Sequence, residues 1–523
     1  MDDTKQYPSI FNDVIGPVMI GQSSSHTAAS VRIGNVVRQL ADGRTVSKIK
    51  FSFDSESSLA TTYKSQGSDI GLLAGLLGFE TYDKRIPDAY KHANESGINF
   101  TFEVQKIGKG HPNAYYINFT THDDEQHNLT ALSTGGGMIK IIEYMGFPVS
   151  IDGGFFEALV ICNDIDSNTI IKKINNELKC EHLLNIMQKN GKSLIHIKST
   201  YELEFGFDSP GTKISRLKPV MPIISQVKPK VPFVTAKEII TYAAVSKNTG
   251  LALWELAVLY ESERSGLLID EIMNKMNNIV STLKQSLTSF DNHEIKDRIL
   301  QNQSHLVEAN NNILGGSFNK NVIKHVTSFM DIKTSMGVFV AAPTAGSCGC
   351  VSGCIFAVAE ELGLTDDEIA KAMLSAGLIG VIIAHRSTFA AEVCGCQAEC
   401  GSGSGMCAAA LAEILGGSVS TCLSAASMAL QNILGLVCDP VGNKVEVPCL
   451  GKNILSAFNG IASANMAASG YDAVIPLDET VAAMDAVGQA IPRELRCTGL
   501  GGLSTTETSL KILQDFEGGK AEC

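Results

Sequence analysis

A segment with four prolines in 19 residues, 216–234 (RLKPVMPIISQVKPKVPFV), divides this chain of 523 residues. Proline fixes φ and lacks a backbone N–H, so this segment cannot be one continuous helix and is typical of a linker. A chain of this length is also too long to be organised around one hydrophobic core. The sequence therefore predicts a multi-domain protein with a linker at 216–234.

The apolar periodicity differs along the chain. Residues 1–152 alternate helical stretches with strand-like runs such as KIKFSFD and AYYINFTT, which predicts an α/β (α+β) domain. Residues 153–215 begin with a strand–helix–strand (βαβ) pattern that resembles the first part of an ACT-type regulatory module. Because the helix and strand that would complete such a module are not evident, we expect a truncated ACT-like segment. Residues 235–523 have apolar residues at spacings of three and four, which predicts a mostly α-helical domain.

The charge distribution excludes some classes of function. The formal net charge is −13, and no stretch is rich in Lys or Arg, which argues against nucleic acid or an anionic membrane as a main partner. The first residues are acidic and polar, unlike a signal or transit peptide. The apolar run MLSAGLIGVIIA is too short to span a bilayer and is expected to be a buried helix. We therefore expect a cytoplasmic protein.

The cysteines are concentrated in the C-terminal half. Twelve of the 14 lie between Cys348 and Cys523. In a cytoplasmic chain, such a concentration points to metal binding or catalysis rather than to disulfides. Glycines beside the cysteines and the C-x-C and C-x₃-C spacings favour an iron–sulfur cluster over a zinc knuckle, which normally pairs two C-x₂₋₄-C units.

A hydroxyl-rich motif, SSSHT at residues 23–27, stands at the start of a predicted helix. A helix N-terminus has free N–H groups and a favourable dipole for an anion. The hydroxyls of Ser23, Ser24, Ser25 and Thr27 add donors, and His26 can donate or move a proton. The residues alone leave two interpretations open: a binding site for a substrate carboxylate, or ordinary helix capping.

Several motifs together resemble one known family. SIFNDVIGPVMIGQSSSHTAASVRIGNVVR, GHPNAYYINF and STGGGMIKI are similar to the β portion of iron–sulfur-dependent L-serine dehydratases (L-serine ammonia-lyases). MGVFVAAPTAGSCG, GCQAECGSGSGM, LGLVCDPVGNKVEVPC and IPRELRCTGLGGLSTTET are similar to the α portion. The resemblance implies a fused, single-chain member. It also implies that the 23–27 motif holds the substrate carboxylate.

The resemblance further implies a [4Fe–4S] cluster held by three cysteines, with one iron open to substrate. The positions that match are Cys348 and Cys396, with Cys407 as the best third candidate. Cys407 lies 11 residues after Cys396, so the glycine-rich stretch between them is expected to fold back as a turn. The third ligand stays open because additional cysteines lie nearby: Cys350, Cys394 and Cys400. The C-terminal Cys523 is a candidate latch on the open iron.

The implied reaction is deamination of L-serine to pyruvate and ammonia through β-elimination of water. Hydroxide is a poor leaving group, and a Lewis-acid iron on the β-hydroxyl lowers the barrier by several kcal/mol. The candidates for the base that removes the Cα proton are His26, Lys64 and His385. Alternatives on the same scaffold are a cysteine desulfidase, a threonine dehydratase and an inactive amino-acid sensor. We expect a small-molecule substrate and a homodimer, with no nucleic-acid or membrane partner.

Overall fold

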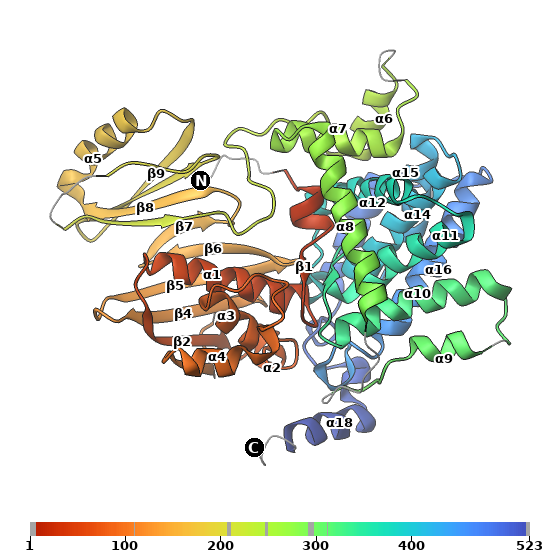
Figure 1. Cartoon of the computed structure of the whole chain (residues 1–523), viewed down its shortest axis with the longest axis horizontal. Coiled ribbons are helices and arrows are strands. Elements are labelled where there is room, and N and C mark those ends of the chain that lie inside the picture. The colour runs from red at the N-terminus through yellow and green to blue at the C-terminus, as the bar shows by residue number, and fades with distance from the viewer. Residues whose placement is uncertain are drawn as a thin grey trace.

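The computed structural model describes residues 7–108, 110–206, 211–245, 249–290, 298–310 and 312–518. Its chain forms an N-terminal α/β part, a smaller part with a second sheet, and a C-terminal helical part (Figure 1). This arrangement confirms the predicted multi-domain architecture, with sheets before the proline-rich segment and helices after it.

The N-terminal part is built on a six-stranded sheet in the order β3-β2-β4-β5-β6-β7. Strands β2 and β3 are parallel and the other neighbours are antiparallel. The strand bounds are β2 (Val46–Asp54), β3 (Asn99–Gln105), β4 (Ala114–Thr121), β5 (Gln126–Gly135), β6 (Met138–Tyr144) and β7 (Phe147–Ile151). The helices are α1 (Ala29–Leu40), α2 (Leu59–Thr62), α3 (Ser68–Leu76) and α4 (Ala89–Glu95).

Helices α1 and α3 pack unusually closely, and glycine explains why. A Cβ on Gly34 would lie 2.4 Å from the carbonyl oxygen of Leu72, and one on Gly75 would lie 2.0 Å from that of Val31. Any larger residue would force the two helices apart. This contact fixes the direction of α1, and therefore the position of the hydroxyl-rich motif that precedes it.

The first described residues belong to the helical part and not to the N-terminal sheet. The π-helical turn η1 (Ile10–Val14) buries its apolar residues in the core of the helical part. Strand β1 (Val18–Met19) pairs with β12 (Phe339–Val340). The Ser9 hydroxyl donates to Glu261 Oε1 at 2.8 Å. The chain therefore crosses from one part to the other immediately before the SSSHT motif.

The small part is a four-stranded antiparallel sheet in the order β11-β8-β10-β9 with one helix. Its elements are β8 (Phe156–Asn163), α5 (Asp164–Glu177), β9 (His182–Lys189), β10 (Lys192–Ser199) and β11 (Lys213–Leu217). Strand β11 corrects the sequence-based expectation that a completing strand is missing. Between β10 and β11, residues 200–206 and 211–212 form no helix. The assignment as an ACT-like module stays a prediction.

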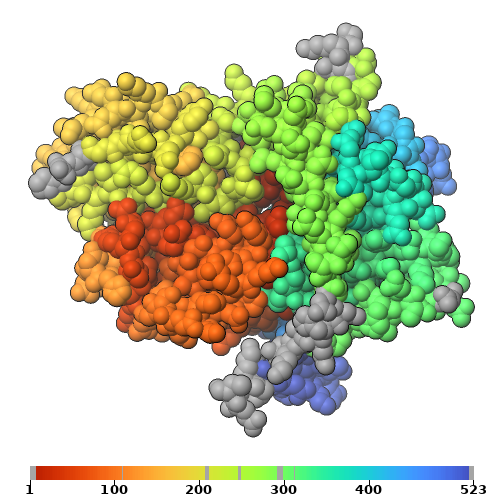
Figure 2. All heavy atoms as spheres, viewed as in Figure 1, coloured from red at the N-terminus to blue at the C-terminus, as the bar shows by residue number. Residues whose placement is uncertain are grey.

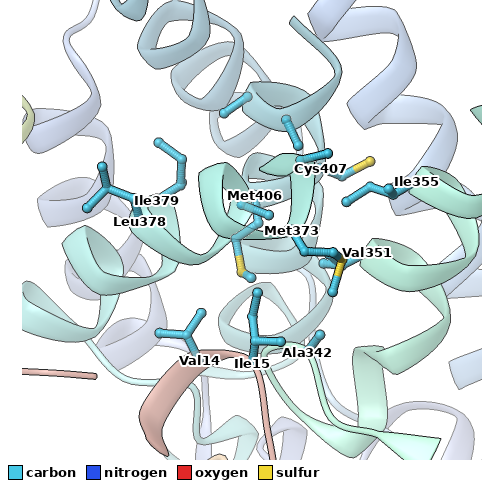
Figure 3. Packing of buried hydrophobic residues seen from close by; sticks show 14 of the residues in the cluster. Val14, Ile15, Ala342, Val351, Ile355, Met373, Leu378, Ile379, Met406 and Cys407 are labelled. Atoms are coloured by element: carbon cyan, nitrogen blue, oxygen red, sulfur yellow. The ribbon is translucent and has the colours of Figure 1, made fainter. Parts of the chain in front are cut away.

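The helical part has a core of Ala- and Gly-rich helices. Figure 3 shows Met373, Leu378 and Ile379 of α12 and Met406 and Cys407 of α14 in one buried apolar cluster. Its helices are α6 (Ala236–Ala243), α7 (Leu253–Ser265), α8 (Ile269–Ser289), α9 (Ser304–Ala309), α10 (Gly316–Thr334), α11 (Cys354–Leu362), α12 (Asp366–Arg386), α13 (Ala391–Cys394), α14 (Ser402–Ile414), α15 (Val419–Gln431), α16 (Cys449–Ala468), α17 (Leu477–Ala490) and α18 (Glu507–Gly518).

Two helical segments are long and apolar enough to cross a membrane by length and composition, Ala345–Leu362 and Asp366–Arg386. In each, 78% of the apolar window is buried inside the protein. Helix α12 contains the MLSAGLIGVIIA run and extends beyond it at both ends. Both segments therefore have the character of core helices.

Candidate active site

A small cavity lies where the N-terminal part meets the helical part. Ser23 and Gln66 line it from the N-terminal side. From the helical side it is lined by Gly346, Ala391, Glu392, Glu399, Cys438, Pro440, Val445, Cys449 and Cys497. The structure thus brings the hydroxyl-rich motif against loops that carry the cysteines.

Four buried thiols gather around this cavity. The ligand atoms of Cys396, Glu399 and Cys438 all lie within 4.8 Å of one another. The N–H of Cys497 donates to the Cys438 carbonyl, which places Cys497 beside Cys438. Cys449 lines the same cavity and all four cysteines are free. Soft sulfur donors of this kind are typical ligands of zinc or of iron–sulfur clusters.

The loops that carry these thiols are fixed by backbone hydrogen bonds. The N–H of Cys438 donates to the Leu495 carbonyl at 2.8 Å, and the N–H of Cys497 donates to the Cys438 carbonyl at 2.9 Å. Cys497 has a φ of 57°, which is uncommon for a non-glycine residue. The two loops therefore hold Cys438 and Cys497 beside each other although 59 residues separate them in sequence (497 minus 438).

Burial strongly affects the acid groups of the site. Desolvation raises the pKa of the Cys449 thiol, and it raises the pKa of Glu399 to about 7. Hydrogen bonds to the Cys396 and Cys497 thiols, together with burial, raise the pKa of Cys438. A cation bound among these groups would reverse that preference, because thiolates are the metal-binding form of cysteine.

Several helices begin at the cavity. The π-helical turn η2 (Ser24–Ala28), which continues into α1, begins beside it with Ser23 as N-cap. The turn η4 (Ala345–Ser347) starts a helical segment on the other side, and α16 begins at Cys449. Helix N-termini stabilise anions, so their convergence favours both thiolates and a substrate carboxylate.

The hydroxyl-rich motif is divided between binding and structural roles. The Ser24 hydroxyl accepts from the N–H of Ala345 at 3.2 Å, which ties the motif to the helical part. The Thr27 hydroxyl donates to the Gln66 carbonyl at 2.9 Å. Of the five motif residues, only Ser23 lines the cavity, while Ser25 and His26 are buried behind it.

The tautomer of His26 follows from its partners. The Thr62 hydroxyl donates to the Ser58 carbonyl at 2.7 Å, so it accepts from His26 Nε2–H at 2.9 Å. His26 Nδ1 is then unprotonated and accepts from the Ser23 hydroxyl at 3.1 Å. Glu392 Oε1 lies 3.5 Å from the same Nδ1. Burial raises the pKa of Glu392, which favours its protonated form next to this lone pair.

The buried position of His26 makes folding stability depend on pH. Desolvation lowers its pKa from 6.5 to about 3, so between these values the unfolded chain binds one more proton than the folded chain. Stability therefore falls as pH decreases through this window, by about 1.4 kcal/mol per pH unit from this group. We expect Tm to fall less between pH 6 and pH 5 in His26→Gln than in the wild type. His122→Gln, at an exposed histidine, is the control, and equal pH slopes for all three proteins would contradict the assignment.

The other two candidate bases lie away from the cavity. Lys64 is exposed, with its Nζ 5.7 Å from the ring centroid of Tyr63. His385 is in the last turn of α12 and does not line the cavity. Among the three candidates, only His26 is at the site.

Of the predicted cluster ligands, only Cys396 belongs to the group of thiols at the cavity. Cys348 lies between η4 and η5 (Gly349–Gly353), with its Sγ 4.0 Å from Met330 Sδ. Cys407 is within α14, and its Sγ lies against Gly460 of α16. The prediction of a turn before Cys407 is wrong, because residues 397–414 are helical throughout.

The remaining cysteines considered from the sequence have other surroundings. The Cys394 thiol donates to Asp485 Oδ1 at 3.8 Å. Asn453 Nδ2 donates to the Cys400 thiol at 3.7 Å, and the N–H of Cys350 donates to Asn453 Oδ1 at 2.9 Å. Cys523 lies outside the described residues.

Sequence reasoning missed six residues of the site: Gln66, Glu392, Glu399, Cys438, Cys449 and Cys497. Two of them have a local signal. In CDPVGNKVEVPC, a Pro–Gly turn separates two cysteines, and the second immediately precedes an apolar-periodic helix. The cavity thus combines buried thiols, which are possible metal ligands, with a helix start of the kind that binds anions.

Comparisons with known proteins give the family. A family model described as serine dehydratase alpha chain matches residues 248–504. The L-serine dehydratase alpha chain of Peptoniphilus asaccharolyticus is 37% identical over 288 residues, which are 54% of this chain and 97% of that protein. A probable L-serine dehydratase beta chain of Bacillus subtilis is 44% identical over 159 residues, 30% of this chain and 70% of that protein.

The chain belongs to the L-serine dehydratase family. It carries, in one polypeptide, regions similar to both the alpha and the beta chains of these relatives. The resemblance found in the sequence motifs is thereby confirmed.

Proposed function

We propose that this chain deaminates L-serine to pyruvate and ammonia with a [4Fe–4S] cluster held by Cys396, Cys438 and Cys449. The observation that supports this most strongly is the group of buried, free thiols at the cavity that Ser23 also lines. Family membership supports the substrate and the reaction. The geometry favours Cys438 and Cys449 over Cys348 and Cys407 as partners of Cys396.

The residues present fit such a cluster. Cys396 follows a glycine with a φ of 70°, and Cys449 begins a helix, so backbone N–H groups lie beside both thiols. A Cβ on Gly346 would lie 2.7 Å from Glu399 Oε1, so this wall of the cavity has no room for a side chain. Thiolates near helix N-termini and glycine backbone are typical of iron–sulfur sites. When bound, the cluster supplies a Lewis acid for the departing β-hydroxyl.

The chain itself supplies substrate binding and orientation. The N-cap Ser23 and the free N–H groups of η2 suit the substrate carboxylate, as at other helix N-termini. His26 is neutral at physiological pH, and its Nδ1 holds the Ser23 hydroxyl in a fixed orientation. Glu392 lines the cavity next to this pair and is placed to exchange a proton with the substrate.

The cavity also limits access of water. Ser23, Glu392 and Gln66 are at most 9% exposed, and the Gln66 amide donates to the Cys497 thiol at 3.4 Å. A dry site strengthens interactions with the charged substrate. After elimination, the released enamine tautomerises and hydrolyses in water to the 2-oxo acid and ammonia.

The decisive experiment is an anaerobic assay with iron and sulfide measured on the same preparation. We expect about four irons per chain, pyruvate release from L-serine, and slower or no turnover of L-threonine and L-cysteine. Exposure to air should remove both the colour and the activity. Colourless protein that stays active in air would contradict the cluster, and sulfide release from L-cysteine as the faster reaction would reassign the substrate.

A further inference from the structure

The loop between Cys438 and Cys449 is held on one side by Lys333 of α10. The Lys333 Nζ donates to the Val445 carbonyl at 2.6 Å, and Val445 lines the candidate active-site cavity. Lys333 is 0% exposed. It does not line the open hollow that Figure 2 shows between the orange N-terminal part, the yellow small part and the green helix α8. The side chain therefore places an ammonium group inside the protein, next to a residue of the cavity wall.

The charge of this ammonium group is not balanced by an acidic side chain. Among the described residues, no carboxylate forms an ion pair with Lys333. The acidic residues closest along the chain to Lys333 and Val445 are Asp331 and Glu446, and both face Arg298. Asp331 Oδ1 lies 3.8 Å from Arg298 Nη2, and Glu446 Oε2 lies 3.8 Å from Arg298 Nε. A buried charge without a partner of opposite sign is costly, so Lys333 requires an anion that these residues do not supply.

A second lysine holds the other end of the same loop, but its charge is balanced. Lys452 of α16 donates from Nζ to the Val437 carbonyl at 2.7 Å. The same Nζ donates to Asp439 Oδ1 at 2.8 Å, in an ion pair whose side chains are 11% and 8% exposed. Of the two lysines that hold this loop, only Lys333 has a positive charge that no described carboxylate neutralises.

The thiols at the cavity can supply the missing negative charge. Burial is the largest cause of the raised pKa of the Cys449 thiol, and the charge of Lys333 acts in the opposite direction. Thiolates are the form of cysteine that binds metal, and a [4Fe–4S] core with three thiolate ligands has a net negative charge. A buried ammonium group beside the cavity is the electrostatic complement of such a group.

We propose that Lys333 is the counter-cation of the cluster, which means that its ammonium group balances the negative charge of the thiolate-bound metal. Its hydrogen bond also fixes Val445 in the wall of the cavity. Lys333 is thus a positioning residue, and the inference rests on the proposed function through the cluster. A positive charge stabilises the reduced cluster, which is the more negative one, more than it stabilises the oxidised cluster.

The reduction potential of the cluster tests this role. It is measured on the full-length, cluster-loaded chain by anaerobic titration with dithionite, followed by EPR. We expect Lys333→Met to lower the equilibrium constant for reduction about tenfold or more, which is about 59 mV for one electron. Lys333→Arg keeps a charged donor, so its potential should stay closer to the wild type than to Lys333→Met. Lys198→Met removes a lysine of similar burial (2% exposed) from β10 of the small part and should leave the potential unchanged.

Iron and sulfide analysis of the same samples covers the case in which Lys333→Met folds without a cluster. Iron in Lys333→Arg but not in Lys333→Met would then support the role of the charge, and iron missing from both would overturn it. An unchanged potential in Lys333→Met, or an equal fall in Lys198→Met, would also overturn the proposal. Lys333→Gln, which is smaller and uncharged, replaces Lys333→Met if that chain does not fold, with the same expected result. Wild-type protein without iron would instead contradict the proposed function.

Discussion

We expect the Cys438→Ala variant, purified without oxygen, to contain almost no iron or acid-labile sulfide. Its Sγ lies within 4.8 Å of the Cys396 Sγ and of a Glu399 carboxylate oxygen, so its loss removes one member of the group of donors that lie together at the site. L-serine turnover should fall by about a thousandfold or more, because a Lewis acid at the leaving group contributes several kcal/mol. Iron, sulfide and pyruvate release are measured on one preparation.

Two matched variants make this result specific. Cys407→Ala and Cys348→Ala also remove buried thiols, but from the core of the helical part and not from the cavity. Both should keep iron and sulfide at the level of the wild type. The opposite pattern, with iron retained in Cys438→Ala and lost in Cys348→Ala or Cys407→Ala, would restore the ligand set predicted from the sequence.

The parts of the fold that the sequence predicts are those determined by local pattern. The proline-rich segment at 216–234 interrupts helix, and the apolar spacing after residue 235 is helical, so the division of the chain follows directly. Pairings between distant segments leave no such pattern. Strand β1 pairs with β12, more than 300 residues later, and η1 packs into the helical part. Neither contact is encoded by residues near it in the sequence.

The same reasoning explains why the turn expected before Cys407 is absent. The glycines between Cys396 and Cys407 were expected to form a turn, which is their common role. In the structure they allow helices to approach: a Cβ on Gly405 would lie 3.1 Å from Leu430 Cγ. A cysteine on that helix consequently points into the core, and the second and third thiols of the site come from loops 42 and 53 residues beyond Cys396 (438 and 449 minus 396).

The hydroxyl-rich motif was recognisable because its function is local. Consecutive hydroxyl residues at a helix start serve an anion or a cap whatever the tertiary structure. Ser23 fits both interpretations, because it is the N-cap and also lines the cavity. The Thr27 hydroxyl has a structural role, since it donates to the Gln66 carbonyl. The sequence alone could not assign a binding role to one hydroxyl and a structural role to another, because the groups that these hydroxyls contact lie on other elements.

We expect His26→Ala to lower kcat/KM for L-serine by about 10- to 100-fold while the iron content stays unchanged. The imidazole is hydrogen-bonded to Ser23 and Thr62 and lies 3.5 Å from Glu392. Its removal leaves these buried groups without their partner and frees the Ser23 hydroxyl to rotate. Steady-state kinetics and iron analysis of the same anaerobic sample measure the effect.

The two other candidate bases provide the controls for this experiment. Lys64→Ala and His385→Ala change residues that lie away from the cavity, and both should keep kcat/KM within about twofold of the wild type. A larger loss in either variant than in His26→Ala would place the proton-transfer group outside the cavity described here. Loss of iron in His26→Ala would show that the imidazole maintains the thiol-bearing loops. Unchanged iron with reduced kcat/KM separates substrate handling, which depends on the N-terminal part, from metal binding, which depends on the helical part.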